Sequence, residues 1–236
     1  MSTRPFATRA QRAERLARAR LYLCTAPRPD EHELRRFAAD VISAGVDIVQ
    51  VRDKRLDVDL RAPLVTVAAV AARLDALSAA NDWPDLAQAT DTDILHVGQA
   101  DAPPRAARQH VREHLIGLST RNRAQVDAAV ADPDVDYFCV GPVWETPTKP
   151  GRPAAGLALL RHAADVAPPG AGKPWFAIGG IDENNLDAVL EHGARRIVVV
   201  RAITESPDPA TAAARLAVRL RTAASGDASD RDAEAR

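Results

Sequence analysis

The chain has 236 residues, with 31 Lys and Arg against 32 Asp and Glu and a formal net charge of −1. This balance, an aromatic content of only 4% and the lack of an apolar run of membrane-spanning length argue against nucleic-acid partners and a membrane protein. Cys24 and Cys139 both lie in apolar runs, so we expect buried thiols rather than a disulfide or a metal pair. The arginine-rich N-terminus lacks the apolar core of a secretory signal, and we take the cytoplasm as the default location.

Short apolar runs alternate with helical patterns along most of the chain. Strands are predicted at 21–25, 46–54, 77–80, 93–97, 115–119, 135–140, 175–178 and 196–200. Helices are predicted between Asp30 and Gly45, at 58–74, 83–89, from about 103, and at 122–131, 156–167, 183–191 and 208–222. This alternation predicts an α/β fold of a single domain, a (β/α)8 TIM barrel over residues 20–223. The alternative is a doubly wound open sheet, which is weakened because no G-x-G-x-x-G follows the first strand.

The two ends of the chain differ from the barrel in composition. Residues 1–19 carry five arginines, and we expect a loose or helical basic arm that is exposed to solvent. Residues 224–236 are polar and charged, and we expect a disordered tail there.

The second predicted strand ends with polar side chains at every second position, Gln50, Arg52 and Lys54. Because side chains alternate across a strand, these three point the same way and span roughly 13 Å. Two cations that face an interior are costly unless an anion neutralises them, so the pattern favours an elongated anionic ligand. The alternative is a strand end whose charges face water.

Polar residues also follow the other strands, at the end that carries the active site in barrels of this kind. The candidates are Gln50, Arg52, Lys54, Asn81, Asp82, Gln99, Asp101, Ser119, Thr146, Thr148, Lys149, Gly179, Gly180, Val200 and Arg201. Ordinary polar loops would account for two or three of them. A complementary set after seven consecutive strands instead predicts one site at this mouth of the barrel.

Asp82 and Asp101 are hard oxygen donors that follow neighbouring strands. Two carboxylates combined with water and phosphate oxygens suit Mg²⁺. The alternative is that each aspartate caps the helix that follows it, because Pro84 and Pro103 stand close behind. Each aspartate alone fits both interpretations equally, but the nearby cations favour a metal site.

Two further segments suit a phosphate group. Residues 145–149 offer two hydroxyls, backbone N–H groups and the Lys149 ammonium, although a proline-rich surface loop would have the same composition. Gly179-Gly180 and the segment after Val200 match the phosphate cradle common in this fold, although paired glycines also serve a turn with positive φ.

The remaining titratable residues show no familiar catalytic set. The histidines have no metal-binding spacing, and His96, within a strand, is a candidate to support site residues from behind. There is no Ser-His-Asp arrangement, while a Schiff-base role for Lys54 or Lys149 stays open.

These stretches resemble the thiamine phosphate synthase family. The matching segments, in the family's order, are 50–54 (Gln-Val-Arg-Asp-Lys), 81–82 (Asn-Asp), 96–101 (His-Val-Gly-Gln-Ala-Asp), 141–149 (Gly-Pro-Val-Trp-Glu-Thr-Pro-Thr-Lys) and 178–181 (Ile-Gly-Gly-Ile). The resemblance covers roughly residues 20–205, and its Q-x-R-x-K and T-x-T-K elements together are specific.

The resemblance implies a transferase that joins hydroxymethylpyrimidine diphosphate to a thiazole phosphate and releases diphosphate. It assigns the pyrimidine diphosphate to Gln50, Arg52, Lys54, Asn81, Ser119 and Lys149, among which Arg52, Lys54, Ser119 and Lys149 are the catalytic candidates. It assigns the thiazole phosphate to Thr146, Thr148, Gly180, Val200 and Arg201, and Mg²⁺ to Asp82 and Asp101. It also implies a homodimer.

Two positions depart from the family pattern. Trp83 stands where the family usually has Arg, and Arg201 stands where a small residue such as Ser is frequent. Two other functions compete with the synthase: a tautomerase acting on the thiazole, which needs a general base, and a regulatory protein that binds thiamine intermediates without coupling them.

Overall fold

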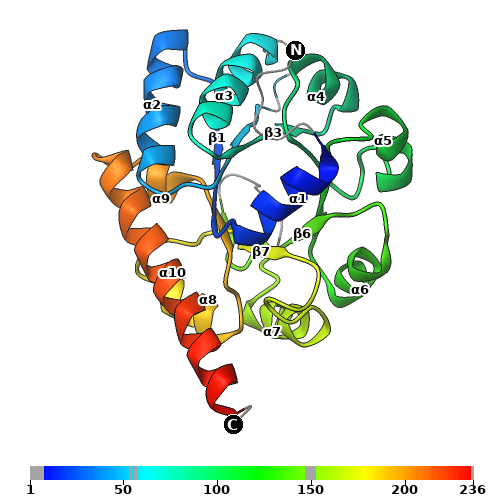
Figure 1. Ribbon diagram of the computed structural model, residues 1–236, viewed down its shortest axis with the longest axis vertical. Coiled ribbons are helices and arrows are strands. Elements are labelled where there is room, and N and C mark those ends of the chain that lie inside the picture. Colours follow the sequence, from blue (N-terminus) through cyan, green and yellow to red (C-terminus); the bar gives the residue numbers. More distant parts are fainter. Residues whose placement is uncertain (1–7, 54, 56–57, 147–152, 235–236) are drawn as a thin grey trace.

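The computed structural model describes residues 8–53, 55, 58–146 and 153–234. Its strands form a closed parallel barrel in chain order, in which β1 pairs with both β2 and β8. Helices surround the barrel, and α1 lies across one of its ends (Figure 1). The predicted single-domain (β/α)8 TIM barrel is confirmed, and the doubly wound alternative is wrong.

The elements follow the predicted order. The strands are β1 Leu21–Thr25, β2 Ile48–Val51, β3 Leu77–Asn81, β4 Ile94–Val97, β5 Leu115–Thr120, β6 Tyr137–Val140, β7 Trp175–Ile178 and β8 Ile197–Val199. The helices are α1 Arg9–Arg18, α2 Glu31–Ser43, α3 Arg61–Arg73, α4 Pro84–Thr90, α5 Pro104–His110, α6 Arg123–Ala131, α7 Leu157–Val166, α8 Leu186–Glu191, α9 Arg201–Thr204 and α10 Pro209–Glu234. No helix within the described ranges is long and apolar enough to cross a membrane.

Successive side chains along each strand alternate between two separate parts of the hydrophobic core. Leu21 and Leu23 of β1 belong to the layer between the barrel and the helices, whereas Tyr22 and Cys24 point into the barrel. Both faces are buried, so each strand is a nearly continuous apolar run, which is why the strands were recognisable in the sequence. β2 begins two residues later than predicted because the Val46 N–H donates to the Val41 carbonyl and still belongs to the turn after α2.

Three aspartates stand directly before β2, β4 and β6, at the N-terminal end of the barrel. In each of them, Oδ2 accepts a hydrogen bond from a backbone N–H of a neighbouring strand. The bonds run from Leu21 to Asp47 (3.0 Å), from Ser78 to Asp93 (2.9 Å) and from Ile116 to Asp136 (2.7 Å). The carboxylates therefore satisfy backbone donors near the starts of β1, β3 and β5.

Helix α1 supplies the counter-charges for these carboxylates. The ion pairs are Arg15–Asp47 at 3.0 Å, Arg12–Asp93 at 3.1 Å and Arg9–Asp136 at 2.7 Å. Every third residue of a helix lies on nearly the same face, so one helix laid across the barrel can reach three strands. We call α1 with these three aspartates the basal clamp.

The basal clamp corrects our expectation for the N-terminal arm. Arg12 and Arg15 are buried and Leu16 packs inside the barrel, so this part of the arm is not exposed to solvent as predicted. The sequence shows the arginines but not that three distant carboxylates meet beneath them.

The C-terminal tail also differs from expectation. Helix α10 runs through Glu234, so residues 224–234 are helical rather than disordered. Extending an existing helix adds one hydrogen bond per residue without the cost of a new nucleus. The end of α10 extends past the barrel in Figure 1.

Arg12→Ala should destabilise the fold by about 3–5 kcal/mol, because it leaves the carboxylate of Asp93 buried without its cation. Arg18→Ala is the matched control, since Arg18 lies on the same helix but is exposed. It should cost less than about 0.5 kcal/mol. Urea denaturation measures both, and equal losses in the two variants would show that the buried pair is not needed.

Burial lowers the pKa of His114 from 6.5 to about 4, so the folded chain keeps this imidazole neutral. Between these two pH values the unfolded chain binds a proton that the folded chain does not, so stability is lost as the pH falls. From pH 7 to pH 5 the wild type should lose about 2 kcal/mol more than His114→Gln. His110→Gln, at a residue that is largely exposed, should lose as much as the wild type. Identical curves for all three chains would contradict this account.

Candidate active site

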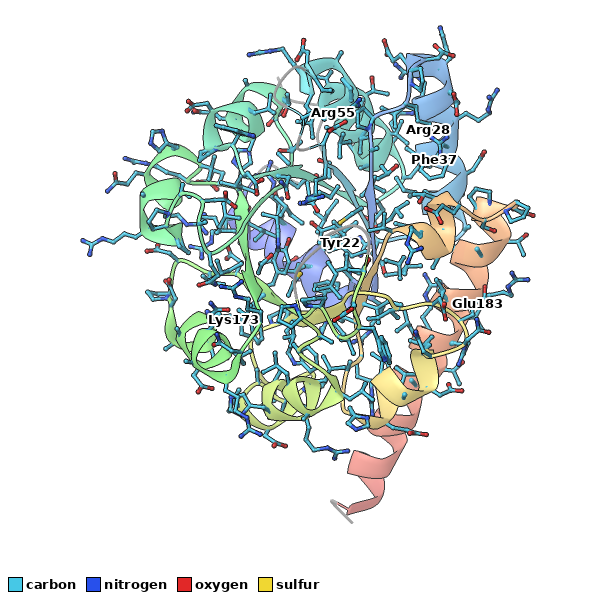
Figure 2. The ribbon with its side chains drawn as sticks, turned by 180° about the vertical axis from the view of Figure 1, so that it is seen from behind. Tyr22, Arg28, Phe37, Arg55, Lys173 and Glu183 are labelled. Carbon is cyan, nitrogen blue, oxygen red and sulfur yellow. The ribbon has the colours of Figure 1, made fainter. Side chains whose placement is uncertain are left out.

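A cavity of about 660 Å³ opens at the C-terminal ends of the strands, opposite α1. Figure 2 looks onto this end of the barrel. Every strand contributes to its wall, because in a closed parallel barrel all strand ends meet at one mouth.

The family resemblance assigns roles to thirteen residues; the structure describes ten of them, and all ten line this cavity. They are Gln50, Arg52, Asn81, Asp82, Asp101, Ser119, Thr146, Gly180, Val200 and Arg201. Lys54, Thr148 and Lys149 lie outside the described residues. The ten residues lie in or after seven strands and meet at one cavity. The role of each residue remains a prediction.

A chain of buried polar groups forms one wall. Cys24 Sγ donates to Gln50 Oε1 at 2.8 Å, and Gln50 Nε2 donates to Asn81 Oδ1 at 3.2 Å. These bonds occupy the carbonyl oxygens of both amides, so the Asn81 amino group remains to donate to a ligand. Cys24 and Cys139 are both buried and neither forms a disulfide, as expected.

Arg52 provides a cation at the cavity wall. Its backbone N–H donates to the Thr25 carbonyl at 2.9 Å, and its half-buried side chain forms no ion pair with another described residue. The neighbouring Asp53 instead pairs with Arg55 at 2.7 Å, and this hydrogen bond lowers the pKa of Asp53. The guanidinium of Arg52 is therefore available to an anion in the cavity.

The two candidate metal ligands do not cap the helices that follow them. The N-terminal caps are Trp83 for α4 and Pro103 for α5, and neither helix has a side-chain cap. Asp101 Oδ2 instead accepts the Gly98 N–H at 2.7 Å. Asp82 has φ +67° and donates its own N–H to the His96 carbonyl. The capping alternative is therefore wrong.

The donor set at this wall fits Mg²⁺ better than a metal that needs many protein ligands. Among the described residues, no cluster of three or more His, Cys, Asp or Glu side chains could hold a metal. Two carboxylates with water and substrate oxygens are the typical magnesium environment. The hydrogen bond from Gly98 orients the Asp101 carboxylate and leaves Oδ1 for a ligand.

The opposite wall is built from backbone in close contact. The Val143 N–H donates to the Ile178 carbonyl at 2.9 Å, and the Trp144 N–H donates to the Gly179 carbonyl at 3.1 Å. Gly179 has φ +109°, and a Cβ there would lie 2.5 Å from Pro142 Cα. Gly179 is therefore needed both for its conformation and for this contact. A short helix, α9, follows Val200.

His96 lies beneath the cavity, where the sequence suggested a supporting role, but its tyrosine partners were not predicted. His96 Nε2 lies 2.9 Å from Ser119 Oγ, and His96 Nδ1 lies 3.0 Å from the Tyr137 hydroxyl. The Tyr137 hydroxyl lies 3.3 Å from that of Tyr22. The alternation along β1 and β6 could have placed both tyrosines inside the barrel, but not in contact with His96.

Comparison with known proteins gives the family. The family model of thiamine monophosphate synthase matches residues 21–203. The chain belongs to the thiamine monophosphate synthase family. A relative from Acidothermus cellulolyticus, thiamine-phosphate synthase, is 56% identical over 211 residues, which cover 89% of this chain and 98% of the relative. The thiamine-phosphate synthase of Mycobacterium leprae is 55% identical over 86% of this chain and 91% of its own length.

Solved structures agree on the fold of this thiamine monophosphate synthase family member. Thiamine phosphate pyrophosphorylase from Pyrococcus furiosus has a TM-score of 0.75, with 24% identity over 89% of this chain and 98% of that chain. A 3-hexulose-6-phosphate synthase has a TM-score of 0.60, with 21% identity over 84% of this chain and 98% of that chain. At these identities the likeness supports the barrel fold alone.

Gly179→Ala should lower stability by about 1–3 kcal/mol from its backbone conformation, with a further loss from the clash with Pro142. Gly156→Ala is the matched control, because Gly156 also has positive φ (+74°) but no atom within 4 Å of an added Cβ. Thermal unfolding of both variants separates the two costs. If Gly156→Ala were as damaging as Gly179→Ala, close contact would not explain Gly179.

Proposed function

We propose that the chain is a thiamine-phosphate synthase, a transferase that condenses hydroxymethylpyrimidine diphosphate with a thiazole phosphate to give thiamine phosphate and diphosphate. The observation that carries this proposal is the 56% identity, over 89% of the chain, to a relative named for this activity. The ten predicted residues around one cavity support it independently.

The pyrimidine would lie against Gln50 and Asn81. The hydrogen bonds from Cys24 to Gln50 and from Gln50 to Asn81 set the direction in which both amides face. The Asn81 amino group then meets a ring nitrogen, which is an acceptor. Both amides are buried, so a ligand that leaves them unpaired is disfavoured.

The diphosphate would be held by Arg52, Lys54, Lys149 and Ser119. In the reaction, the bond between the pyrimidine methylene carbon and the diphosphate oxygen breaks, and diphosphate keeps the electron pair. The amino group of the ring stabilises the resulting cation, and the thiazole nitrogen donates its lone pair to the methylene carbon. This sequence needs no nucleophile or strong base from the protein, only cations and donors placed where negative charge develops.

Asp82 and Asp101 would hold Mg²⁺ beside the diphosphate. When bound, the ion would neutralise charge on the leaving group. The chain positions both carboxylates for this by the conformation of Asp82 and by the Gly98 hydrogen bond to Asp101. Two protein carboxylates leave the remaining coordination positions to water and phosphate oxygens.

The thiazole phosphate would be bound by Thr146, Thr148, Gly180, Val200 and Arg201, partly through backbone N–H groups. Arg201 departs from the family pattern, and its guanidinium lies at the cavity, 4.0 Å from Glu205. It would add a positive charge that a small residue lacks. Trp83, the other departure, is 57% exposed and is not among the described residues that line the cavity.

The geometry favours the synthase over the two alternatives. A tautomerase needs a general base in the cavity, and within the described residues His96 is the only histidine that lines it. Both ring nitrogens of His96 already have partners, Tyr137 and Ser119. A regulatory protein would not need the paired carboxylates or the cation of Arg52.

The setting of the reaction follows from the same observations. The partners would be the two small phosphorylated substrates, and we propose neither a nucleic acid nor a membrane. Two buried thiols that form no disulfide fit the reducing cytoplasm that we expected. The homodimer remains a proposal that rests on the family resemblance.

Incubating the full chain with both substrates and Mg²⁺ should release diphosphate, which neither alternative produces. Asp101→Ala and Lys149→Ala should each slow this release by at least about 100-fold, by the magnitude known for single electrostatic groups. Asp85→Ala is the control, because the Asp85 side chain is 94% exposed near the same mouth. Near-normal rates for both site variants would refute the assignment of these residues.

A further inference from the structure

A column of four polar side chains runs through the barrel to the floor of the cavity. Its members are Tyr22, Tyr137, His96 and Ser119. The successive separations are 3.3 Å between the tyrosine oxygens, 3.0 Å from Tyr137 to His96 Nδ1 and 2.9 Å from His96 Nε2 to Ser119 Oγ. All of these lie within hydrogen-bond distance, and Ser119 stands at the cavity end of the column.

The barrel is built closely around this column. Both tyrosines are almost fully buried, and Phe176 packs edge-on against each of them, with ring centroids 5.6 Å apart. Gly117 leaves the space that Tyr137 fills, since a Cβ there would collide with the ring and hydroxyl of Tyr137. Figure 2 shows Tyr22 near the centre of the barrel.

The hydrogens of the column have one arrangement that satisfies every donor. Tyr22 has a single hydrogen-bond partner among the described residues, the Tyr137 hydroxyl. If Tyr137 donated to Tyr22, or if His96 Nδ1–H donated to Tyr137, one tyrosine hydrogen would be buried without an acceptor. Buried unsatisfied donors are costly and rare. Tyr22 therefore donates to Tyr137, and Tyr137 donates to His96 Nδ1.

This direction sets the tautomer of His96. A neutral imidazole that accepts at Nδ1 carries its proton on Nε2. The Nε2–H group then donates to Ser119 Oγ and occupies a lone pair of that oxygen, so the Ser119 hydrogen faces the cavity. Burial raises the pKa of Tyr22 and of Tyr137 well above 10, so both hydroxyls remain donors at neutral pH.

We propose that Tyr22, Tyr137 and His96 are positioning residues that hold Ser119 as a hydrogen-bond donor toward an anionic oxygen in the cavity. The tautomer is a property of the protein alone, whereas its use on the departing diphosphate rests on the proposed function. His96 in this arrangement is a donor to Ser119 and not a base that removes its proton.

Nitrogen NMR of the full chain labelled with ¹⁵N-histidine tests the tautomer without any substrate. His96→Gln identifies the His96 signals among the six histidines. At pH 7.5, Nε2 should be protonated and Nδ1 should be an unprotonated acceptor. A proton on Nδ1, or on both nitrogens, would overturn the proposal.

Two further variants test whether Tyr137 donates to His96. Tyr137→Phe removes this donor, so the ¹⁵N signal of Nδ1 should move to the position of an acceptor without a hydrogen bond. Phe176→Leu is the control, because it disturbs the packing of both tyrosines but removes no hydrogen bond, and the Nδ1 signal should not change. If both variants shifted the signal equally, or neither did, Tyr137 would not act through a hydrogen bond.

Kinetics of diphosphate release test the consequence for Ser119. Gln at position 96 can replace the Nε2–H donor, whereas Leu cannot, so kcat of His96→Gln should exceed that of His96→Leu by about tenfold. The effect should fall on kcat more than on KM, because the bond strengthens as charge develops. Equal rates would show that donation to Ser119 is unimportant. No release by the wild type would refute the proposed function but leave the NMR result valid.

Discussion

The closure of eight parallel strands in chain order is the constraint on which the rest of the molecule depends. Closure brings every strand start to one end of the barrel and every strand end to the other. It also leaves a narrow interior in which alternate side chains of each strand must pack against each other. The barrel therefore has three regions: the base at the strand starts, the interior, and the mouth at the strand ends. Each functional feature of the protein lies in one of them.

The base and the mouth use charge in opposite ways. At the base, the arginines of α1 pair with three carboxylates that also accept hydrogen bonds from backbone N–H groups. In the pairs of Arg12 and Arg15 both partners are buried, so removing either one leaves a buried charge, and this end is suited to stability. At the mouth, Arg52 makes no ion pair within the described chain, and the Asp101 carboxylate is only partly used. A ligand that carries both signs of charge can neutralise both groups. A diphosphate with Mg²⁺ is such a ligand, because the phosphate oxygens suit the arginine and the metal ion suits the carboxylate.

The interior joins the two ends. A small barrel is normally filled with apolar side chains. Here the part of the interior next to the cavity carries amides, hydroxyls, a thiol and an imidazole. Buried polar groups are tolerated when each has a partner, and a fully paired network admits few alternative arrangements. The polar groups that reach the cavity, Asn81 and Ser119, therefore present defined donors. These donors are already in place before a ligand binds, so fewer groups have to reorient during the reaction.

The sequence by itself determined the order of strands and helices, the barrel and ten residues that converge at its mouth. It could do so because each strand is buried on both faces and because strand ends in such a barrel share one location. Tertiary structure alone decided the basal clamp, since Asp47, Asp93 and Asp136 are far apart in the chain and meet only under α1. It also decided that Asp101 bonds to Gly98 rather than capping a helix, and that Tyr22, Tyr137 and His96 form one column. These contacts depend on side-chain direction across strands that closure brings together, and no local pattern of residues records that direction.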